Sequence, residues 1–143
     1  MSTAQSTNTG ATCALVKLGS TYAGKQGFNY FEGVSKESVG SQAICMHLLT
    51  IPPKSRASVH LHESHETAIY VISGHGAMWY GDQLEQEMRF EAGDMIYIPA
   101  GVPHLPANTS ETEPCTAVLA RTDPNEQESV VLRPDLEALA PPI

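Results

Sequence analysis

Three histidines have the type and the spacing to bind a metal ion. His60 and His62 are one residue apart, so on an extended strand both imidazoles point to the same face. A third histidine, His104, follows a Pro/Gly turn later in the chain. Three neutral imidazoles that converge on one point suit a borderline divalent metal. The sequence therefore predicts a metal site formed by His60, His62 and His104.

The residues around His104 control the path of the chain. Gly93, Pro99, Gly101, His104 and Asn108 follow one another at intervals of six, two, three and four residues. A glycine permits a tight turn, and proline followed by glycine ends a strand and redirects the chain. We expect His104 to point inward after this turn. Asn108 is expected to form a turn, because its side chain bonds readily to nearby backbone.

The apolar pattern predicts short strands on both sides of these histidines. Runs typical of strands occupy residues 28–34, 43–51, 67–73, 77–80, 88–91, 95–98, 115–121 and 130–132, with an edge strand expected over 14–18 and a loop over 19–27. We expect residues 74–76 to turn the chain, so that 77–80 pairs with 67–73 as a hairpin. Pro134 predicts a short final helix through Ala140. About ten strands, with a turn about every 8–12 residues, indicate an all-β sandwich or barrel.

Composition limits the class of partner. The chain has 143 residues, enough for one domain, and carries a net charge of −8, which argues against nucleic acid and anionic membranes. It contains no apolar run of about 20 residues and no convincing secretory signal at its start. The three cysteines are widely spaced and form no CxxC. We therefore expect no disulfide framework and a cytoplasmic protein.

The two histidine segments, residues 60–74 and 93–108, resemble the paired motifs of the cupin superfamily. Cupins are small β-barrels that usually hold a metal ion. The resemblance in architecture covers residues 42–121 and implies a single-domain jelly-roll barrel over residues 13–143, after a disordered tail over 1–12. No internal repeat indicates a second barrel. Small cupins commonly pair through N-terminal strands, so the resemblance also implies a homodimer.

The first segment departs from the family pattern. Cupins typically have a glutamate ligand seven residues before the hairpin glycine, and Thr67 stands there. Glu66 is one residue away, and in a strand an offset of one residue points a side chain to the opposite face. The glycine expected six residues before His60 is replaced by Lys54.

Several ligand sets follow from this departure. The three histidines alone could hold the metal, with Thr67 as a non-ligand. A fourth ligand could come from His65 or Glu63 in the loop after His62, or from Glu66 if a bulge rotates it inward. The remaining alternative is a barrel without metal, in which the histidines are polar core.

The ligand set determines the chemistry through its charge. Three neutral imidazoles leave a divalent metal with its full charge and with open positions for a bidentate anionic substrate and dioxygen. Three-histidine cupins resemble thiol, diketone and gentisate-type dioxygenases, which use Fe(II). The first hypothesis is therefore an Fe(II)-dependent dioxygenase acting on a small anionic molecule. The alternatives are a non-redox isomerase, lyase or decarboxylase that uses Mn, Zn or Ni, and a barrel that binds a small ligand without catalysis.

Four further residues are candidates for the substrate pocket. They lie on strands near the two motifs and carry polar groups: His47, Thr67, Tyr97 and Arg121. Arg121 could neutralise a bound carboxylate. In a non-redox enzyme, an acid or base could come from Glu63, Glu66, His47 or Tyr97.

Overall fold

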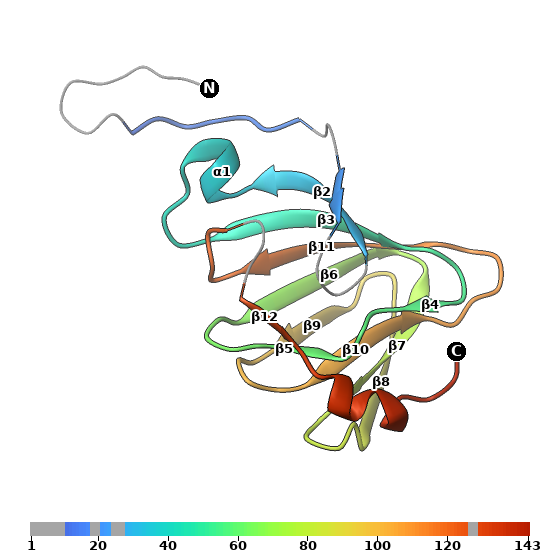
Figure 1. The fold of residues 1–143 in the computed structure, drawn as a ribbon. Helices are drawn as coiled ribbons and strands as arrows, with labels where there is room; N and C mark the ends of the chain where they lie inside the picture. The colour runs from blue at the N-terminus through green and yellow to red at the C-terminus, as the bar shows by residue number, and fades with distance from the viewer. Residues whose placement is uncertain (1–10, 18–20, 24–27, 126–128) are drawn as a thin grey trace.

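The computed structural model describes the chain except for residues 1–10, 18–20, 24–27 and 126–128. The expected disordered tail over residues 1–12 therefore lies almost wholly outside the described residues, and so does most of the expected loop over 19–27. Residues 11–17 are described and contain no strand, so the edge strand expected over 14–18 is wrong for its described part. In Figure 1 this segment runs past the barrel beyond α1 (Lys36–Val39), a helical turn that the strand pattern did not predict.

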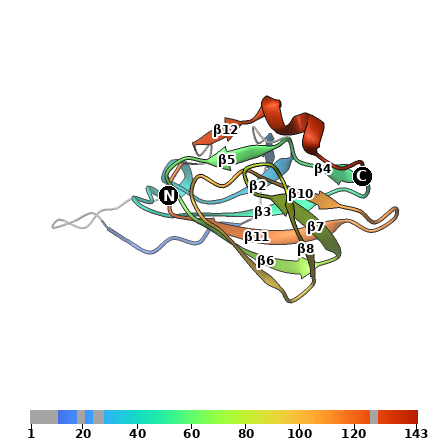
Figure 2. The same ribbon diagram turned by 90° about the horizontal axis from the view of Figure 1, so that it is seen from below.

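The described residues form two antiparallel sheets that face each other (Figures 1 and 2). Sheet A has the order β1 (Thr21–Ala23), β2 (Asn29–Val34), β3 (Cys45–Ile51), β11 (Cys115–Arg121), β6 (Thr67–Ser73) and β9 (Met95–Ile98). Sheet B has the order β12 (Val130–Leu132), β5 (His60–His62), β10 (His104–Asn108), β7 (His75–Tyr80) and β8 (Gln86–Glu91), and β4 (Ser55–Arg56) pairs with β10. This is the predicted all-β jelly-roll barrel.

The predicted hairpin between residues 67–73 and 77–80 is wrong. β7 pairs with β8 and β10 in sheet B, whereas β6 pairs with β11 and β9 in sheet A. The chain changes sheets at Gly74, which has a φ of 85°. A Cβ at this position would lie 2.5 Å from the carbonyl oxygen of Pro114. Only glycine combines this left-handed backbone with so close an approach. The prediction failed because a glycine turn between two strands has the same sequence pattern whether the strands pair as a hairpin or join different sheets.

Lys54 stands where the resemblance implies a glycine. Its φ of 54° lies in the left-handed region that glycine adopts at least cost.

The core lies between the two sheets. In β3 the inward positions are Cys45, His47, Leu49 and Ile51, and burial alternates along the strand as a two-residue period requires. β11 shows the same alternation from Cys115 to Arg121. The apolar core also receives Phe28, Val71, Met78, Phe90, Ile96 and Ile98 from neighbouring elements. One end of this interior is polar, because Cys45 and Arg121 form a cross-strand pair there.

A short C-terminal helix covers the outer face of sheet B (Figure 2). The predicted final helix is present as a 3-10 helix, η1 (Pro134–Leu139). Its Leu136 packs with Val59 and Leu105 in a second apolar cluster. In the described part of the chain, neither α1 nor η1 has the length and apolar character needed to cross a membrane.

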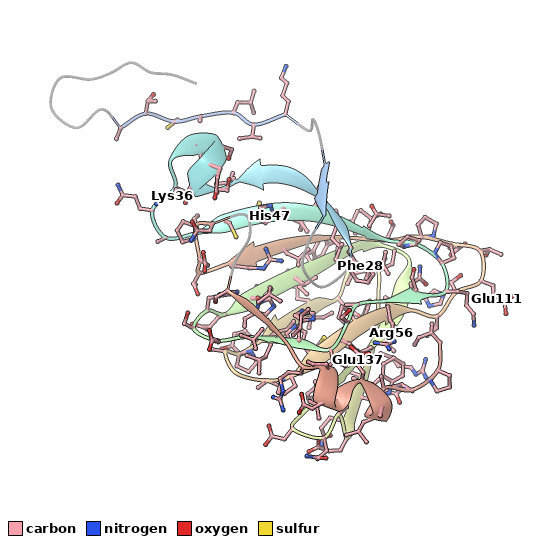
Figure 3. All side chains as sticks on the ribbon, in the orientation of Figure 1. Phe28, Lys36, His47, Arg56, Glu111 and Glu137 are labelled. Carbon is pink, nitrogen blue, oxygen red and sulfur yellow. The ribbon has the colours of Figure 1, made fainter. Side chains whose placement is uncertain are left out.

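Glu137 of η1 holds the segment that leads into β5. Its carboxylate accepts a hydrogen bond from the Arg56 guanidinium at 2.7 Å and another from the Val59 backbone N–H at 2.7 Å. Figure 3 shows Arg56 and Glu137 close together beside η1. Val59 is fully buried and directly precedes His60. The helix thus helps to place β5, the strand that carries His60 and His62.

We predict that Glu137→Ala lowers the free energy of unfolding by about 1–2 kcal/mol, because it removes the acceptor of a buried backbone N–H. The expected fall in melting temperature is roughly 3–8 °C in a chain of this size. Differential scanning calorimetry measures this. Glu111→Ala is the control, because Glu111 lies in an exposed loop away from η1 (Figure 3), and an equal loss in both variants would contradict the role of Glu137.

The loss of stability in Glu137→Ala should depend on pH. Partial burial opposes ionisation of Glu137, but hydrogen bonds from Arg56 and Val59, with the charge of Arg56, outweigh it and lower the pKa from 4.5. A carboxyl with a lowered pKa stabilises the fold above its unfolded value and loses this contribution as the pH falls through its folded value. The difference between wild type and Glu137→Ala should therefore be full at pH 6 and shrink below pH 4.5.

Candidate metal centre

His60, His62 and His104 meet inside the barrel. His60 and His62 lie on β5, and β10 begins with His104, which pairs directly with His60. All three side chains are buried, and their ligand atoms lie within 4.8 Å of one another. The ring centroids of His60 and His104 are 4.3 Å apart. The pairing of β5 with β10 thus brings together two motifs that are distant in the sequence.

Two backbone carbonyls orient the rings. His60 donates through Nδ1 to the Ser58 carbonyl at 2.7 Å, and His104 donates through Nδ1 to the Val102 carbonyl at 2.9 Å. A carbonyl oxygen only accepts, so the proton must be on Nδ1 in both rings. The lone pair of each neutral ring is then on Nε2. This arrangement prepares a histidine for metal binding.

Burial keeps the three imidazoles neutral. Loss of hydration and then the neighbouring His104 lower the pKa of His60 to about 3. Burial also lowers the pKa of His104 to about 4, against the opposing hydrogen bond to Val102. The pKa of His62 is lowered furthest, first by burial and then by His104 and His60. All three rings are therefore able to bind a cation at neutral pH.

The histidines open onto a small and mostly apolar cavity. It leaves about 40 Å³ for the centres of water-sized molecules. Its walls include Leu49, Ile51, Ile69, Val71, Met78, Phe90, Ile96, Ile98, Ala117 and Leu119. Thr67 and Arg121 are the polar lining residues besides the histidines, in the described part of the chain. The cavity therefore suits a ligand of a few non-hydrogen atoms.

Arg121 brings a buried positive charge to this cavity. Its side chain is only 2% exposed, and Nη1 lies 3.9 Å from the Cys45 sulfur. Its charge contributes to the lowered pKa of His60, His62 and His104, which places it within electrostatic reach of all three. Arg121 also pairs across the strands with Thr67. Both of these predicted pocket residues thus line the cavity.

The other two predicted pocket residues, His47 and Tyr97, are not among the residues that line this cavity. His47 is buried on β3 but lines a separate hollow with Gly33 and Val118. Tyr97 points outward because Ile96 and Ile98 take the inward positions of β9. It lines an outer hollow of about 230 Å³ that shares Met78, Ile98 and His104 with the cavity.

The candidate fourth ligands occupy different places. Glu63 is exposed, and exposed Glu66 accepts a hydrogen bond from the Tyr97 hydroxyl at 2.8 Å. The bulge that would turn Glu66 inward is absent from the described backbone at this point, because buried Thr67 takes the inward position. His65 is buried, with its ring 4.6 Å from that of His62, but it lies outside the group of three.

The sequence did not reveal the partners of His65. Its Nδ1 lies 3.3 Å from the Ser129 hydroxyl and 3.5 Å from the Asp123 carboxylate. Both partners come from the polar segment between β11 and β12, where no motif marks them. The carbonyls of Ser58 and Val102 were also missed, although each lies two residues before the histidine that it orients. That shared spacing is a signal that could have found them.

The donor set fits a divalent metal. Three neutral imidazole nitrogens are within reach of one point, and two are oriented by backbone carbonyls. No described carboxylate belongs to this group. His60, His62 and His104 would hold the ion, and any further positions would belong to water or substrate.

We predict that His60→Ala and His104→Ala each weaken binding of divalent metal by at least about 100-fold. Loss of a residue that only hydrogen-bonds to a metal ligand lowers metal affinity by about 10–100-fold, and loss of a ligand should lower it more. Glu66→Gln is the matched control and should retain the metal, because its carboxylate lies outside the barrel. Metal content after dialysis, measured by mass spectrometry, checks this. Loss of metal in Glu66→Gln would contradict the ligand set.

We also predict that metal-free protein loses stability as the pH falls below 6.5. The folded state keeps His60 and His104 neutral, with pKa values of about 3 and 4 instead of 6.5. The unfolded chain then binds more protons, which costs up to about 1.4 kcal/mol per pH unit for each histidine. Urea unfolding of chelator-treated protein between pH 7 and 5 measures this, with His104→Gln expected to show a shallower slope. A free energy of unfolding that is flat over this range would refute the prediction.

Comparisons with solved structures support the fold. The chain is similar to an oxalate decarboxylase of Lactobacillus farciminis in complex with formate, with 20% identity and a TM-score of 0.68 over 85% of this chain and 36% of that one. It is similar to Bacillus subtilis oxalate decarboxylase, studied for its Mn(II) centres, with 22% identity and a TM-score of 0.65 over 82% and 31%. A DMSP lyase of Ruegeria pomeroyi matches with 20% identity and a TM-score of 0.54 over 64% and 44%. The chain thus spans about a third of the length of these decarboxylases.

Sequence comparison identifies the family. A search of curated proteins gives no match. The family model described as a cupin domain matches residues 47–120, just over half of the chain. This match contains both histidine segments and agrees with the two facing sheets and the buried histidines. The chain belongs to the cupin family.

Proposed function

We propose that this cupin is a metal-dependent enzyme that acts on a small anionic molecule, with an Fe(II)-dependent dioxygenase-type reaction as the best assignment. One observation carries the proposal. Three neutral imidazoles and a buried arginine share one cavity, and no acidic side chain lines it among the described residues.

The charges of the cavity favour an anion. Neutral ligands leave a divalent ion with its full charge of +2, and Arg121 adds another positive charge nearby. An anionic substrate that binds beside the metal and Arg121 would be attracted by both charges, and the low dielectric of a buried site strengthens this attraction. A carboxylate matches the planar guanidinium best, because it can accept two parallel hydrogen bonds.

The size of the cavity limits the substrate. The cavity leaves only about 40 Å³ for the centres of water-sized molecules. The substrate, or the part of it that reacts, therefore has few non-hydrogen atoms. Apolar walls made by residues such as Leu49, Phe90 and Leu119 limit the water that can accompany it. A dry cavity strengthens each electrostatic contact inside it.

The bound metal would supply a Lewis acid and, as iron, a one-electron redox partner for dioxygen. The chain contributes position and electrostatics. The histidines hold the ion, Arg121 orients the anion, and the apolar walls exclude water. None of the described lining residues is a carboxylate that could act as a general base. Chemistry performed by metal and dioxygen requires no such base, which supports an oxygenase over a reaction that begins with proton abstraction.

A second candidate is a non-redox decarboxylase or lyase that uses Mn, Zn or Ni. The observation in its favour is the pair of His65 and Asp123, whose side chains are 3.5 Å apart beside His62. A histidine held by a carboxylate can donate or accept a proton. The similar structures include a decarboxylase, which acts on oxalate, and a DMSP lyase. A barrel that binds a small ligand without catalysis is the outcome if both activities are absent.

We also propose that the protein is a homodimer that pairs through the outer face of sheet A. Tyr70 and Ile72 of β6 and Met95 and Tyr97 of β9 are between 42% and 82% exposed. The outward positions of β6 and β11 carry no charged residue. Two copies with a net charge of −8 repel each other over most of their surface. This uncharged face is where a second copy can approach, and large exposed apolar patches mark such interfaces.

The enzymatic proposal predicts that iron-loaded protein consumes dioxygen with a small carboxylate, enolate or thiol as substrate. An oxygen electrode with a panel of thiols, diketones and phenolic or short-chain acids measures this. Arg121→Gln should raise the KM for a carboxylate substrate by about 10–100-fold, since it removes a charge-assisted contact of about 1.5–3 kcal/mol.

His104→Ala serves as the inactive control for that assay. No oxygen uptake by iron-loaded wild type on any compound would refute the oxygenase assignment. Carbon dioxide release from oxalate by Mn-loaded protein under nitrogen would then favour the second candidate.

The dimer proposal predicts that Ile72→Glu converts the protein to a monomer, because it buries a charge in the interface of both copies. Sedimentation velocity measures the mass of the particle. Leu139→Glu is the matched control, since Leu139 is equally exposed, at 48%, but lies on η1 beyond sheet B. A monomeric wild type, or a dimer that persists in Ile72→Glu, would contradict this interface.

A further inference from the structure

Thr67 places a hydroxyl group in the metal cavity. It is the first residue of β6, its side chain is 2% exposed, and it lines the cavity together with the three histidines. Its backbone is held on both sides, because β6 pairs Thr67 with Arg121 of β11 and with Ile98 of β9. The side chain can therefore turn about χ1, but it cannot leave the cavity.

The hydroxyl of Thr67 has no hydrogen-bond partner among the described residues. A buried polar group without a partner destabilises the folded state, because it has lost its hydrogen bonds to water. Valine has the same shape without this cost, so threonine at this position destabilises the protein unless something else completes the bond. A hydroxyl offers one proton and two lone pairs, and it can therefore bind either a donor or an acceptor. The hydroxyl shares its cavity with the three histidines and Arg121, and this setting indicates which molecule completes the bond.

We propose that the Thr67 hydroxyl donates a hydrogen bond to an oxygen atom of the anion that binds beside the metal. This inference rests on the proposed function and adds a substrate preference to it. Arg121 attracts any anion, because its charge is not selective. A hydroxyl donor selects the acceptor atom, since oxygen accepts strongly and sulfur only weakly. Thr67 therefore favours carboxylates and enolates over thiolates.

A threonine at this position also explains how the site differs from one with a carboxylate ligand. Thr67 lies opposite Arg121 in the strand register, and its hydroxyl adds no negative charge to compete with the substrate. The anion is then held by a cation, a metal and a neutral donor. Burial already holds Arg121, Thr67 and the three histidines in place.

The test compares Thr67→Val with wild type in two states. In metal-free protein, Thr67→Val is expected to raise the melting temperature by about 2–5 °C, because it removes an unpartnered buried hydroxyl. In Mn(II)-loaded protein, it is expected to weaken the binding of acetate by about fivefold to tenfold. Changes in the Mn(II) electron paramagnetic resonance spectrum during a titration measure this affinity. Thr67→Ser should stay within about threefold of wild type, because it keeps the donor.

Two controls make the result specific. Thr50→Val removes a hydroxyl from the opposite, outward-facing positions of β3 and should leave acetate affinity unchanged. Titration with 2-mercaptoethanol tests the choice of acceptor. Wild type is expected to bind acetate more tightly than the thiol, and Thr67→Val should reduce that preference.

The outcomes separate this inference from the proposed function. Equal affinity of wild type and Thr67→Val for acetate would overturn the role of Thr67 and leave the anion site intact. A preference of wild type for the thiol would overturn the selectivity. If Mn(II)-loaded wild type bound neither acetate nor the thiol, both the anion site and the role of Thr67 would be refuted.

Discussion

The site depends on one constraint, which is the burial of three imidazoles that must remain uncharged. Loss of hydration dominates the lowered pKa of His60, His62 and His104. The pairing of β5 with β10 makes this burial possible, because it aligns His60 with His104 inside the barrel. Neighbouring parts of the chain hold the rings and their strands in place. Backbone carbonyls orient two rings, and η1 covers the outer face of the strands that carry them.

The interior is divided between a polar end and an apolar body. Arg121 and Thr67 pair at the end that holds the histidines, while leucines and isoleucines fill the rest. This division places the positive charge of Arg121 in a small cavity. A small anion is the ligand that we propose for this site, since Arg121 and a bound divalent ion would both attract it. The proposed chemistry follows from charge and size, because the fold alone allows many functions.

Strand parity made much of this site predictable. A period of two puts His60 and His62 on one face, and it assigns Thr67 inward and Glu66 outward, as the structure has them. The glycines and prolines around His104 marked the turn that aims it. Parity applied to β9 would also have placed Tyr97 outside, because Ile96 and Ile98 are the apolar positions of that strand. Local periodicity, turn residues and ligand types are properties that a sequence displays directly.

The sequence by itself determined the all-β class, the three candidate ligands and the absence of a carboxylate at position 67. Only the tertiary structure decided which sheet each strand joins and that β6 and β7 belong to different sheets. It also decided that Arg121 pairs with Thr67. It also decided that His47, although inward on β3, lies away from the cavity, and that Asp123 meets His65. The physical reason is that these contacts join segments far apart in the chain. Their geometry arises from packing between sheets, which no local pattern of residues records.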